Sequence, residues 1–108
     1  MKLLALETSL RQSSFALLEG DQLLRQVDID PQRRTAAALT PALDEAFDQV
    51  GWKPPQIELI AVSHGPGSFT GLRIGVATAK ALSYVSGAQV LGIDTLRVIA
   101  AQSPEDIQ

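Results

Sequence analysis

Short apolar runs separated by polar residues occupy the first 30 positions, which is typical of a series of strands. Residues 2–7 form such a run, as a buried strand would. Two more strands are predicted over residues 13–18 and 22–28. The turn sequence Glu19-Gly20-Asp21 lies between these two, so they should pair as an antiparallel hairpin. The polar link at 8–12 favours a first strand that joins the same meander.

From about Arg33 to Val50 the period of the apolar positions becomes helical. At about 100° per residue, seven apolar residues fall within an arc of about 140°: Ala36, Leu39, Ala42, Leu43, Ala46, Phe47 and Val50. Pro41 interrupts the pattern, because a proline inside a helix costs roughly 3 kcal/mol. We expect a long helix that kinks at Pro41; the alternative is a shorter helix that Thr40 caps, with Pro41 at its first position.

The second half of the chain alternates strands with helices. Residues 57–63 form the most apolar strand, suited to the centre of a sheet. A glycine-rich loop at 64–71 follows and opens a helix over about 72–86. Gly87 should end that helix as its C-terminal cap, and a fifth strand is predicted over 89–93.

The last predicted element is a helix to about Gln102, which Asp94 or Thr95 caps. The element order is then β-β-β-α-β-α-β-α, an α/β arrangement with a mixed five-stranded sheet and helices on its faces. This is the ribonuclease H-like unit, which also forms each half of the actin-like ATPases and sugar kinases. We expect one such domain over residues 1–102, and a frayed tail or truncation point at 103–108.

Composition narrows the function classes. The chain has 108 residues, 45% of them hydrophobic and 19% charged, as in an ordinary soluble domain with one core. Its apolar runs are too short for a transmembrane helix, and the absence of cysteine excludes disulfides and thiolate zinc sites. The net charge is −3, and the nine Lys and Arg residues are scattered, so we do not expect this chain to bind tRNA by itself.

The loop sequence GPGSFTGLRIG, residues 65–75, is the most specific feature of the chain. It follows a buried strand and opens a helix, where backbone N–H groups and the helix dipole can hold an anion. Ser68 or Thr70 can cap the helix through a side-chain oxygen. Three glycines permit positive φ angles and the close approach of another backbone: Gly65, Gly67 and Gly71.

Three known loop motifs do not fit this segment. A P-loop ends in Gly-Lys-Ser/Thr, whereas Leu72 and Arg73 follow Gly71. A hydrolase nucleophile elbow reads Gly-x-Ser-x-Gly, whereas Ser68 directly follows Gly67. The dinucleotide fingerprint fails because the glycine after Gly67 comes four residues later, not three. Three interpretations stay open: a strand–helix connection without a ligand, an anion site, or a partner contact.

The glycine segment and the residues 77–82 that follow it closely resemble the signature of the TsaB (YeaZ) family. Residues 3–9 resemble the family's first strand and phosphate-loop remnant, which usually carries Asp at the position of Glu7. Residues 39–43 are similar to its helix segment with a leucine and a proline, and residues 91–96 to its next strand and turn. The resemblance implies the ribonuclease H-like fold.

The chain departs from the family pattern in two places. The family usually has His-Ser or His-Ala after an Arg, where this chain has Arg34-Thr35-Ala36. The second actin-like half of the family is missing, so the resemblance is to an amino-terminal half only.

The resemblance implies a non-catalytic subunit in the formation of threonylcarbamoyladenosine in tRNA. Family members dimerise with the catalytic subunit TsaD, which transfers threonylcarbamoyl to the adenosine beside the anticodon with TsaE as an ATPase helper. We therefore expect no catalytic or metal residue and no cofactor bound by this chain alone, with ATP used by the complex. We expect tRNA contact only through the complex, a cytoplasmic location and no membrane contact. The single histidine agrees, because no His-x-x-x-His metal pair can form.

Two polar residues have more than one interpretation. His64, beside the glycine loop, is expected to pack or bond to backbone, with a general base as the alternative. Glu7 is expected to be a structural turn residue ahead of Thr8 and Ser9, with a metal- or phosphate-facing carboxylate as the alternative.

The helix at 72–86 predicts an interface. Arg73, Ala77, Lys80 and Tyr84 fill a sector of about 60°, and the remaining apolar or small residues cover more than one sheet face needs. The excess is buried against a neighbouring helix or, as we prefer, against a TsaD-type partner, with a homodimer in its absence. Ala79→Arg should then block pairing. The predicted contact residues are Leu39, Leu43, Phe47, Leu72, Gly75, Val76, Ala79 and Ser83.

Two other functions remain as alternatives. A half-domain of an actin-like ATPase or sugar kinase would bind ATP, although the phosphate-binding strands and adenosine pocket of the second half are missing. A glycopeptidase-like protein would cleave peptides, although the chain has no cysteine and no metal-binding histidine pair.

Overall fold

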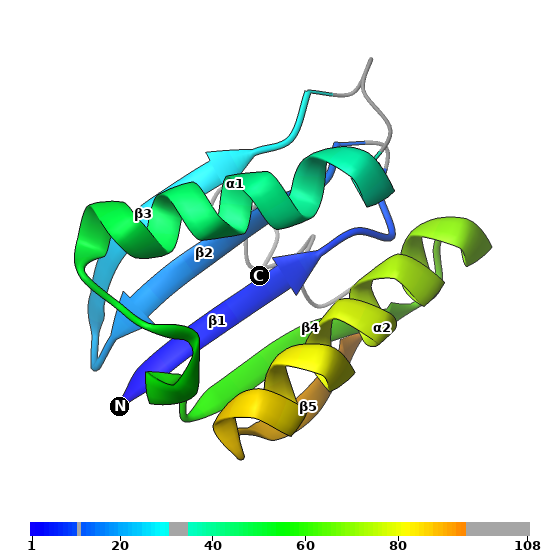
Figure 1. Cartoon of the computed structure of the whole chain (residues 1–108). Helices are drawn as coiled ribbons and strands as arrows, with labels where there is room; N and C mark the ends of the chain where they lie inside the picture. Colours follow the sequence, from blue (N-terminus) through cyan, green and yellow to red (C-terminus); the bar gives the residue numbers. More distant parts are fainter. Residues whose placement is uncertain (11, 31–34, 95–108) are drawn as a thin grey trace, which may run out of the picture.

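The computed structural model describes residues 1–10, 12–30 and 35–94, and its strands form one sheet in the order β3-β2-β1-β4-β5 (Figure 1). The central strand β1 pairs antiparallel with β2 and parallel with β4. The outer pairs are antiparallel β2–β3 and parallel β4–β5. The strands are β1 (Lys2–Glu7), β2 (Ser14–Glu19), β3 (Gln22–Asp28), β4 (Leu59–Gly65) and β5 (Gln89–Asp94). The predicted mixed five-stranded sheet is confirmed.

The amino-terminal meander follows the predicted pattern. β2 and β3 form a hairpin whose turn contains Gly20 in a left-handed conformation, with a φ of 60°. β1 lies beside β2 in the register Leu4↔Leu17 and Leu6↔Phe15. These four side chains are buried, which places one face of the meander in the core.

Helix α1 (Thr35–Val50) runs through Pro41, so the alternative of a shorter helix capped by Thr40 is wrong. Pro41 lacks the N–H that would bond to the carbonyl of Ala37. Both residues are exposed, so water can bond to that carbonyl. A short 3-10 helix (Pro54–Gln56) follows α1 and precedes β4.

Helix α2 (Phe69–Ser86) begins three residues earlier than predicted, because its cap is Ser68. The Ser68 Oγ accepts a hydrogen bond from the Gly71 N–H at 3.2 Å. Thr70 lies inside the helix, so it is not the cap. Gly87 ends α2 with a φ of 75°, and its N–H donates to the Ser83 carbonyl at 2.7 Å, which confirms the predicted C-terminal cap.

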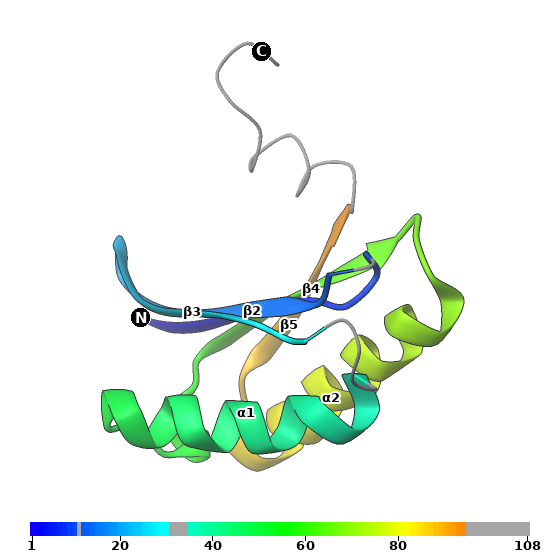
Figure 2. The same cartoon turned by 90° about the horizontal axis from the view of Figure 1, so that it is seen from above.

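Both helices cover the same face of the sheet (Figure 2). The core between them combines inward residues of β1, β2 and β4 with the inner faces of α1 and α2. Among the described residues, no helix covers the opposite face. The predicted last helix, to about Gln102, and the tail at 103–108 lie outside the described residues. Within the described ranges, no helix has both the length and the apolar character that a membrane crossing needs.

Removing the amino-terminal cap of α2 should lower the stability of the protein measurably. We expect Ser68→Ala to lower the free energy of unfolding by about 1 kcal/mol, since the Gly71 N–H loses its side-chain acceptor. Urea unfolding of wild type and variant measures this. The exposed Thr70 provides the control, because Thr70→Ala should change stability by less than about 0.5 kcal/mol. Equal stability of wild type and Ser68→Ala would contradict the capping role.

Candidate functional site

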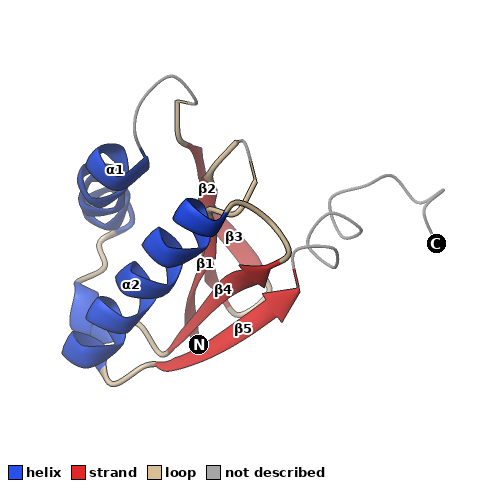
Figure 3. Ribbon diagram, turned by 90° about the vertical axis from the view of Figure 1, so that its right-hand side faces the viewer, coloured by secondary structure: helices blue, strands red, loops and turns tan. Residues whose placement is uncertain are grey.

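The glycine loop connects the end of β4 to the start of α2 and lies against the segment that follows β1 (Figure 3). The Ser68 N–H donates to the Ser9 carbonyl at 2.9 Å, and the Thr8 Oγ1 donates to the Gly71 carbonyl at 2.6 Å. The peptide bond between Gly65 and Pro66 is cis. Two segments about sixty residues apart in the sequence are thus joined by hydrogen bonds.

Close approach, and not left-handed backbone, explains two of the three glycines. Gly65 has a φ of 118°, but Gly67 and Gly71 do not have positive φ angles, so that part of the prediction is wrong. A Cβ on Gly71 would lie 1.9 Å from the Thr8 carbonyl oxygen, and one on Gly67 would lie 2.7 Å from the Ser9 carbonyl oxygen. Any side chain at these positions would collide with backbone, which confirms the predicted close approach.

Two backbone N–H groups at the start of α2 already have hydrogen-bond acceptors within the protein. The Ser68 N–H bonds to the Ser9 carbonyl, and the Gly71 N–H bonds to the Ser68 Oγ. An anion at this helix N-terminus would therefore lack two of its donors. The geometry favours the interpretation of the loop as a strand–helix connection packed against β1.

Glu7 ends β1 with a buried carboxylate, whose residue is 6% exposed. Its Oε1 accepts two hydrogen bonds from Ser9, one from the N–H at 3.0 Å and one from Oγ at 2.5 Å. The Ser63 Oγ donates in turn to the Ser9 Oγ at 3.1 Å. Among the described residues, the Glu7 Oε2 has no hydrogen-bond partner. Glu7 is thus the last residue of β1 and not the expected turn residue, although its Oε1 has a structural role. Within the described residues, its Oε2 is a buried acceptor without a donor.

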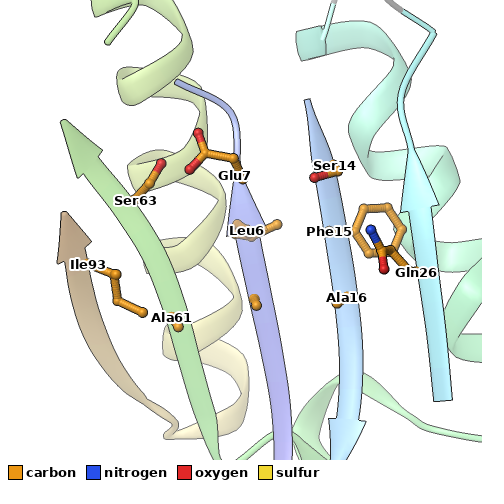
Figure 4. Close-up of a pocket in the computed structure, with 10 residues that line it drawn as sticks. Leu6, Glu7, Ser14, Phe15, Ala16, Gln26, Ala61, Ser63 and Ile93 are labelled. Atoms are coloured by element: carbon orange, nitrogen blue, oxygen red, sulfur yellow. The ribbon is translucent and has the colours of Figure 1, made fainter. Parts of the chain in front are cut away.

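A pocket of about 230 Å³ lies beside this carboxylate (Figure 4). Since the neighbouring residues of the same strands are buried under the helices, alternation places most of the lining side chains on the opposite face of the sheet. The main lining residues are Ala5, Glu7, Ser14, Ala16, Ala61 and Ser63. One signal for this site is present in the sequence, a glutamate that directly ends an apolar strand.

His64 is exposed at the end of β4, and its ring lies over Gly92 of β5. A Cβ on Gly92 would be 2.8 Å from the His64 Cδ2. Across the described ranges, no three His, Cys, Asp or Glu side chains gather as a metal site requires.

A groove of about 330 Å³ separates α1 from α2 on the helical side of the molecule. Thr40 and Asp44 line it from α1, and Ala77 and Ala81 from α2; all four are exposed. Leu43 and Phe47 form its floor but are only 4% and 3% exposed. Ala77 and Ala81 are not among the predicted contact residues: helical periodicity places Ala77 in the polar sector of α2, and nothing in the sequence distinguishes Ala81 from the other small residues.

Five of the eight predicted contact residues are buried in the chain's own core, so their predicted surface position is wrong. They pack against the sheet, and the small ones let α2 approach the strands: a Cβ on Gly75 would lie 2.4 Å from the Thr8 Oγ1. The buried residues are Leu39, Leu43, Phe47, Gly75 and Ala79. Leu72, Val76 and Ser83 are half-buried, and the Ser83 Oγ donates to the Ala88 carbonyl at 2.6 Å.

The excess apolar surface of α2 lies near its two ends. Phe69 is 73% exposed at the start, beside the Arg73 guanidinium at 5.8 Å from its ring centroid. Tyr84 and Val85 are 93% and 59% exposed at the end. These side chains at the ends of α2 are open to a partner, as are the exposed alanines that line the groove.

Known proteins resemble this chain over most of its length. The protein named tRNA threonylcarbamoyladenosine biosynthesis protein TsaB is 30% identical in Bacillus subtilis and 33% identical in Haemophilus influenzae. The matches cover 94% and 93% of this chain, but 44% and 42% of those proteins. A protein of Anaeromyxobacter dehalogenans named tRNA N6-adenosine threonylcarbamoyltransferase is 30% identical over 88% of this chain and 33% of its own. The chain spans less than half the length of these relatives.

Solved structures agree with the sequence matches. YeaZ from Pseudomonas aeruginosa superimposes with a TM-score of 0.84 and 32% identity, over 92% of this chain and 46% of that one. RuvC from Thermus thermophilus has a TM-score of 0.60 at 12% identity, over 99% and 75% of the two chains, and shows the fold alone. Together they confirm the ribonuclease H-like fold.

The family model described as TsaD, tRNA N6-adenosine threonylcarbamoyltransferase, matches residues 29–106. The chain therefore belongs to the family that this model describes, and its resemblance to TsaB (YeaZ), first inferred from the glycine-rich signature, is confirmed.

Proposed function

We propose that this chain is a non-catalytic partner subunit in the formation of threonylcarbamoyladenosine in tRNA. The observation that carries the proposal is the match to TsaB-named relatives over almost the whole chain. The glycine signature supports it, because in this chain the loop is filled by contacts with Thr8 and Ser9 and is not open to a substrate. The sequence also has one histidine, too few for a His-x-x-x-His metal pair.

The partner in this proposal is a TsaD-type catalytic subunit, with a TsaE-type ATPase as the second member of the complex. Relatives of this chain carry both the TsaB and the transferase name, which is consistent with two related subunits that act together. The α1–α2 groove is the proposed contact, because it combines exposed small residues with an apolar floor. The chain forms a homodimer through the same surface when the partner is absent.

The remaining parts of the proposal follow from this role. The chain binds no cofactor alone, and ATP is used by the complex. It reaches tRNA only through the complex, since its own net charge is −3. The location is cytoplasmic, where tRNA is modified.

Reconstitution tests the proposal. The purified chain is combined with a TsaD-type and a TsaE-type subunit of the same organism, ATP, the threonylcarbamoyl donor and tRNA, and modified adenosine is measured. We expect no modified tRNA and no peptide cleavage with the chain alone. Adding the chain to the other two subunits should raise the yield.

Two outcomes would contradict it. Turnover of tRNA by the homogeneous chain would show that it is catalytic. No effect of the chain on the other subunits would remove the partner role. ATP affinity of the isolated chain tighter than millimolar would instead favour the actin-like ATPase or sugar kinase alternative.

A further inference from the structure

The open face of the sheet carries a row of three alanines that leaves a depression beside Glu7. Ala5 pairs in register with Ala16 of β2 on one side and with Ala61 of β4 on the other. Two residues further along the same strands, and therefore on the same face, lie Ser14, Glu7 and Ser63. The pocket of about 230 Å³ occupies this depression (Figure 4). Its floor is apolar and one end is polar.

Three hydrogen bonds at that end run toward Glu7. The Ser63 Oγ donates to the Ser9 Oγ, which donates to the Glu7 Oε1, and the Ser9 N–H donates to the same oxygen. A chain of this direction ends on an acceptor, which here is a carboxylate oxygen. The other oxygen, Oε2, has no hydrogen-bond partner within the described residues and is closed off from bulk water. A buried carboxylate oxygen without a donor costs free energy that a bound donor would restore.

We propose that this pocket binds a compact organic cation, a guanidinium or alkylammonium group. One of its N–H groups donates to the Glu7 Oε2, and its apolar part lies over Ala5, Ala16 and Ala61. This site is separate from the α1–α2 groove, because it lies on the opposite face of the sheet. The inference therefore does not depend on the function proposed above.

The lining of the pocket selects this class of ligand over two others. Glu7 is the one carboxylate among the lining residues, whereas a divalent cation such as Mg²⁺ needs several oxygen ligands at short distance. Among the described residues, no Lys or Arg lines it, so an anion would meet the carboxylate without a counter-charge. The volume suits a group smaller than a typical drug-sized ligand, whose pockets begin at about 300 Å³.

Amide shifts in ¹H–¹⁵N spectra of the full chain test the site with methylguanidinium chloride at non-denaturing, millimolar concentrations. N-methylurea is the matched neutral probe, because it keeps the shape and loses the charge. We expect saturable shifts at Ser9, Ala16 and Ser63 with methylguanidinium and none with N-methylurea. Equal responses to the two probes would overturn the proposal. A saturable response to MgCl₂ without one to methylguanidinium would overturn it too, in favour of a metal site.

Two variants assign the response to the pocket. Glu7→Gln keeps an oxygen for Ser9 and removes the charge, so the affinity for methylguanidinium should fall at least about tenfold. Ala16→Leu fills the depression without touching Glu7 and should have a similar effect, which keeps the test valid if Glu7→Gln fails to fold. Glu19→Gln, at the exposed far end of β2, is the control and should bind like wild type. Unchanged binding by Glu7→Gln or by Ala16→Leu would refute the site.

Discussion

Replacing Gly71 by alanine should destabilise the fold by about 3 kcal/mol, although alanine is the better helix former. Gly71 lies in the first turn of α2, where the intrinsic preference for alanine is worth up to about 1 kcal/mol. The added Cβ would lie 1.9 Å from the Thr8 carbonyl oxygen, and backbone cannot rotate away as a side chain can. The collision must separate α2 from the end of β1, which also weakens the Thr8–Gly71 hydrogen bond.

Gly75→Ala is the graded comparison for this prediction. Its Cβ would meet the Thr8 Oγ1 at 2.4 Å, which is a side-chain atom, and Val62 at 3.2 Å. A rotation of Thr8 relieves part of that contact, so the loss in the free energy of unfolding should be smaller than for Gly71→Ala. Urea unfolding of the two variants measures both losses. A Gly71→Ala protein as stable as wild type would show that the loop tolerates a side chain and that the close approach has no energetic role.

The fold was predictable because its signals are local. The apolar runs at β1 and β3, the turn at Gly20 and the cap at Gly87 each depend on residues a few positions apart. Pro41 was the ambiguous position. The helical period of the apolar residues continues through it, whereas a proline usually marks the end or the first turn of a helix. The helix continues through Pro41 because this turn is exposed, so water can bond to the carbonyl that lacks a partner N–H.

The role of Gly71 could not be predicted from its neighbours. A glycine in a turn-rich loop indicates either a positive φ or a close contact, and the sequence around it is the same in both cases. The deciding atom is the carbonyl oxygen of Thr8, sixty-three positions earlier in the chain. The same holds for Glu7, because the alanines that leave space beside its Oε2, which has no partner among the described residues, belong to strands far apart in the sequence.

Five of the predicted contact residues turn out to be buried for a different reason. The periodicity of α2 correctly showed small and apolar residues on several sides, but it does not tell which side faces the sheet. Gly75 and Ala79 form the side that packs on the sheet, because their small size allows the closest approach to the strands. The proposed partner contact therefore lies at the edge of the helix toward α1, where α2 lines the groove.

Ala81→Arg should weaken binding to a TsaD-type subunit by at least about 100-fold, which corresponds to about 3 kcal/mol, and should leave the chain folded. Ala81 is exposed and lines the α1–α2 groove, so an arginine there adds bulk and a charge that a closed contact would have to desolvate. The earlier choice, Ala79→Arg, would not separate binding from folding, because Ala79 is fully buried. Gln22→Arg adds the same charge at the exposed start of β3, at the other edge of the sheet, and should bind as wild type does.

Calorimetric titration with the TsaD-type subunit measures the affinity, and circular dichroism checks that each variant keeps its secondary structure. Sedimentation of the chain alone across a concentration series provides a second readout, since the homodimer should use the same groove. Ala81→Arg should then be monomeric at concentrations where wild type and Gln22→Arg pair. If Ala81→Arg binds the TsaD-type subunit as tightly as wild type, the groove is not the interface. The exposed Phe69 and Tyr84 at the ends of α2 then become the next surface to mutate, because they are the most exposed aromatic side chains of the described residues.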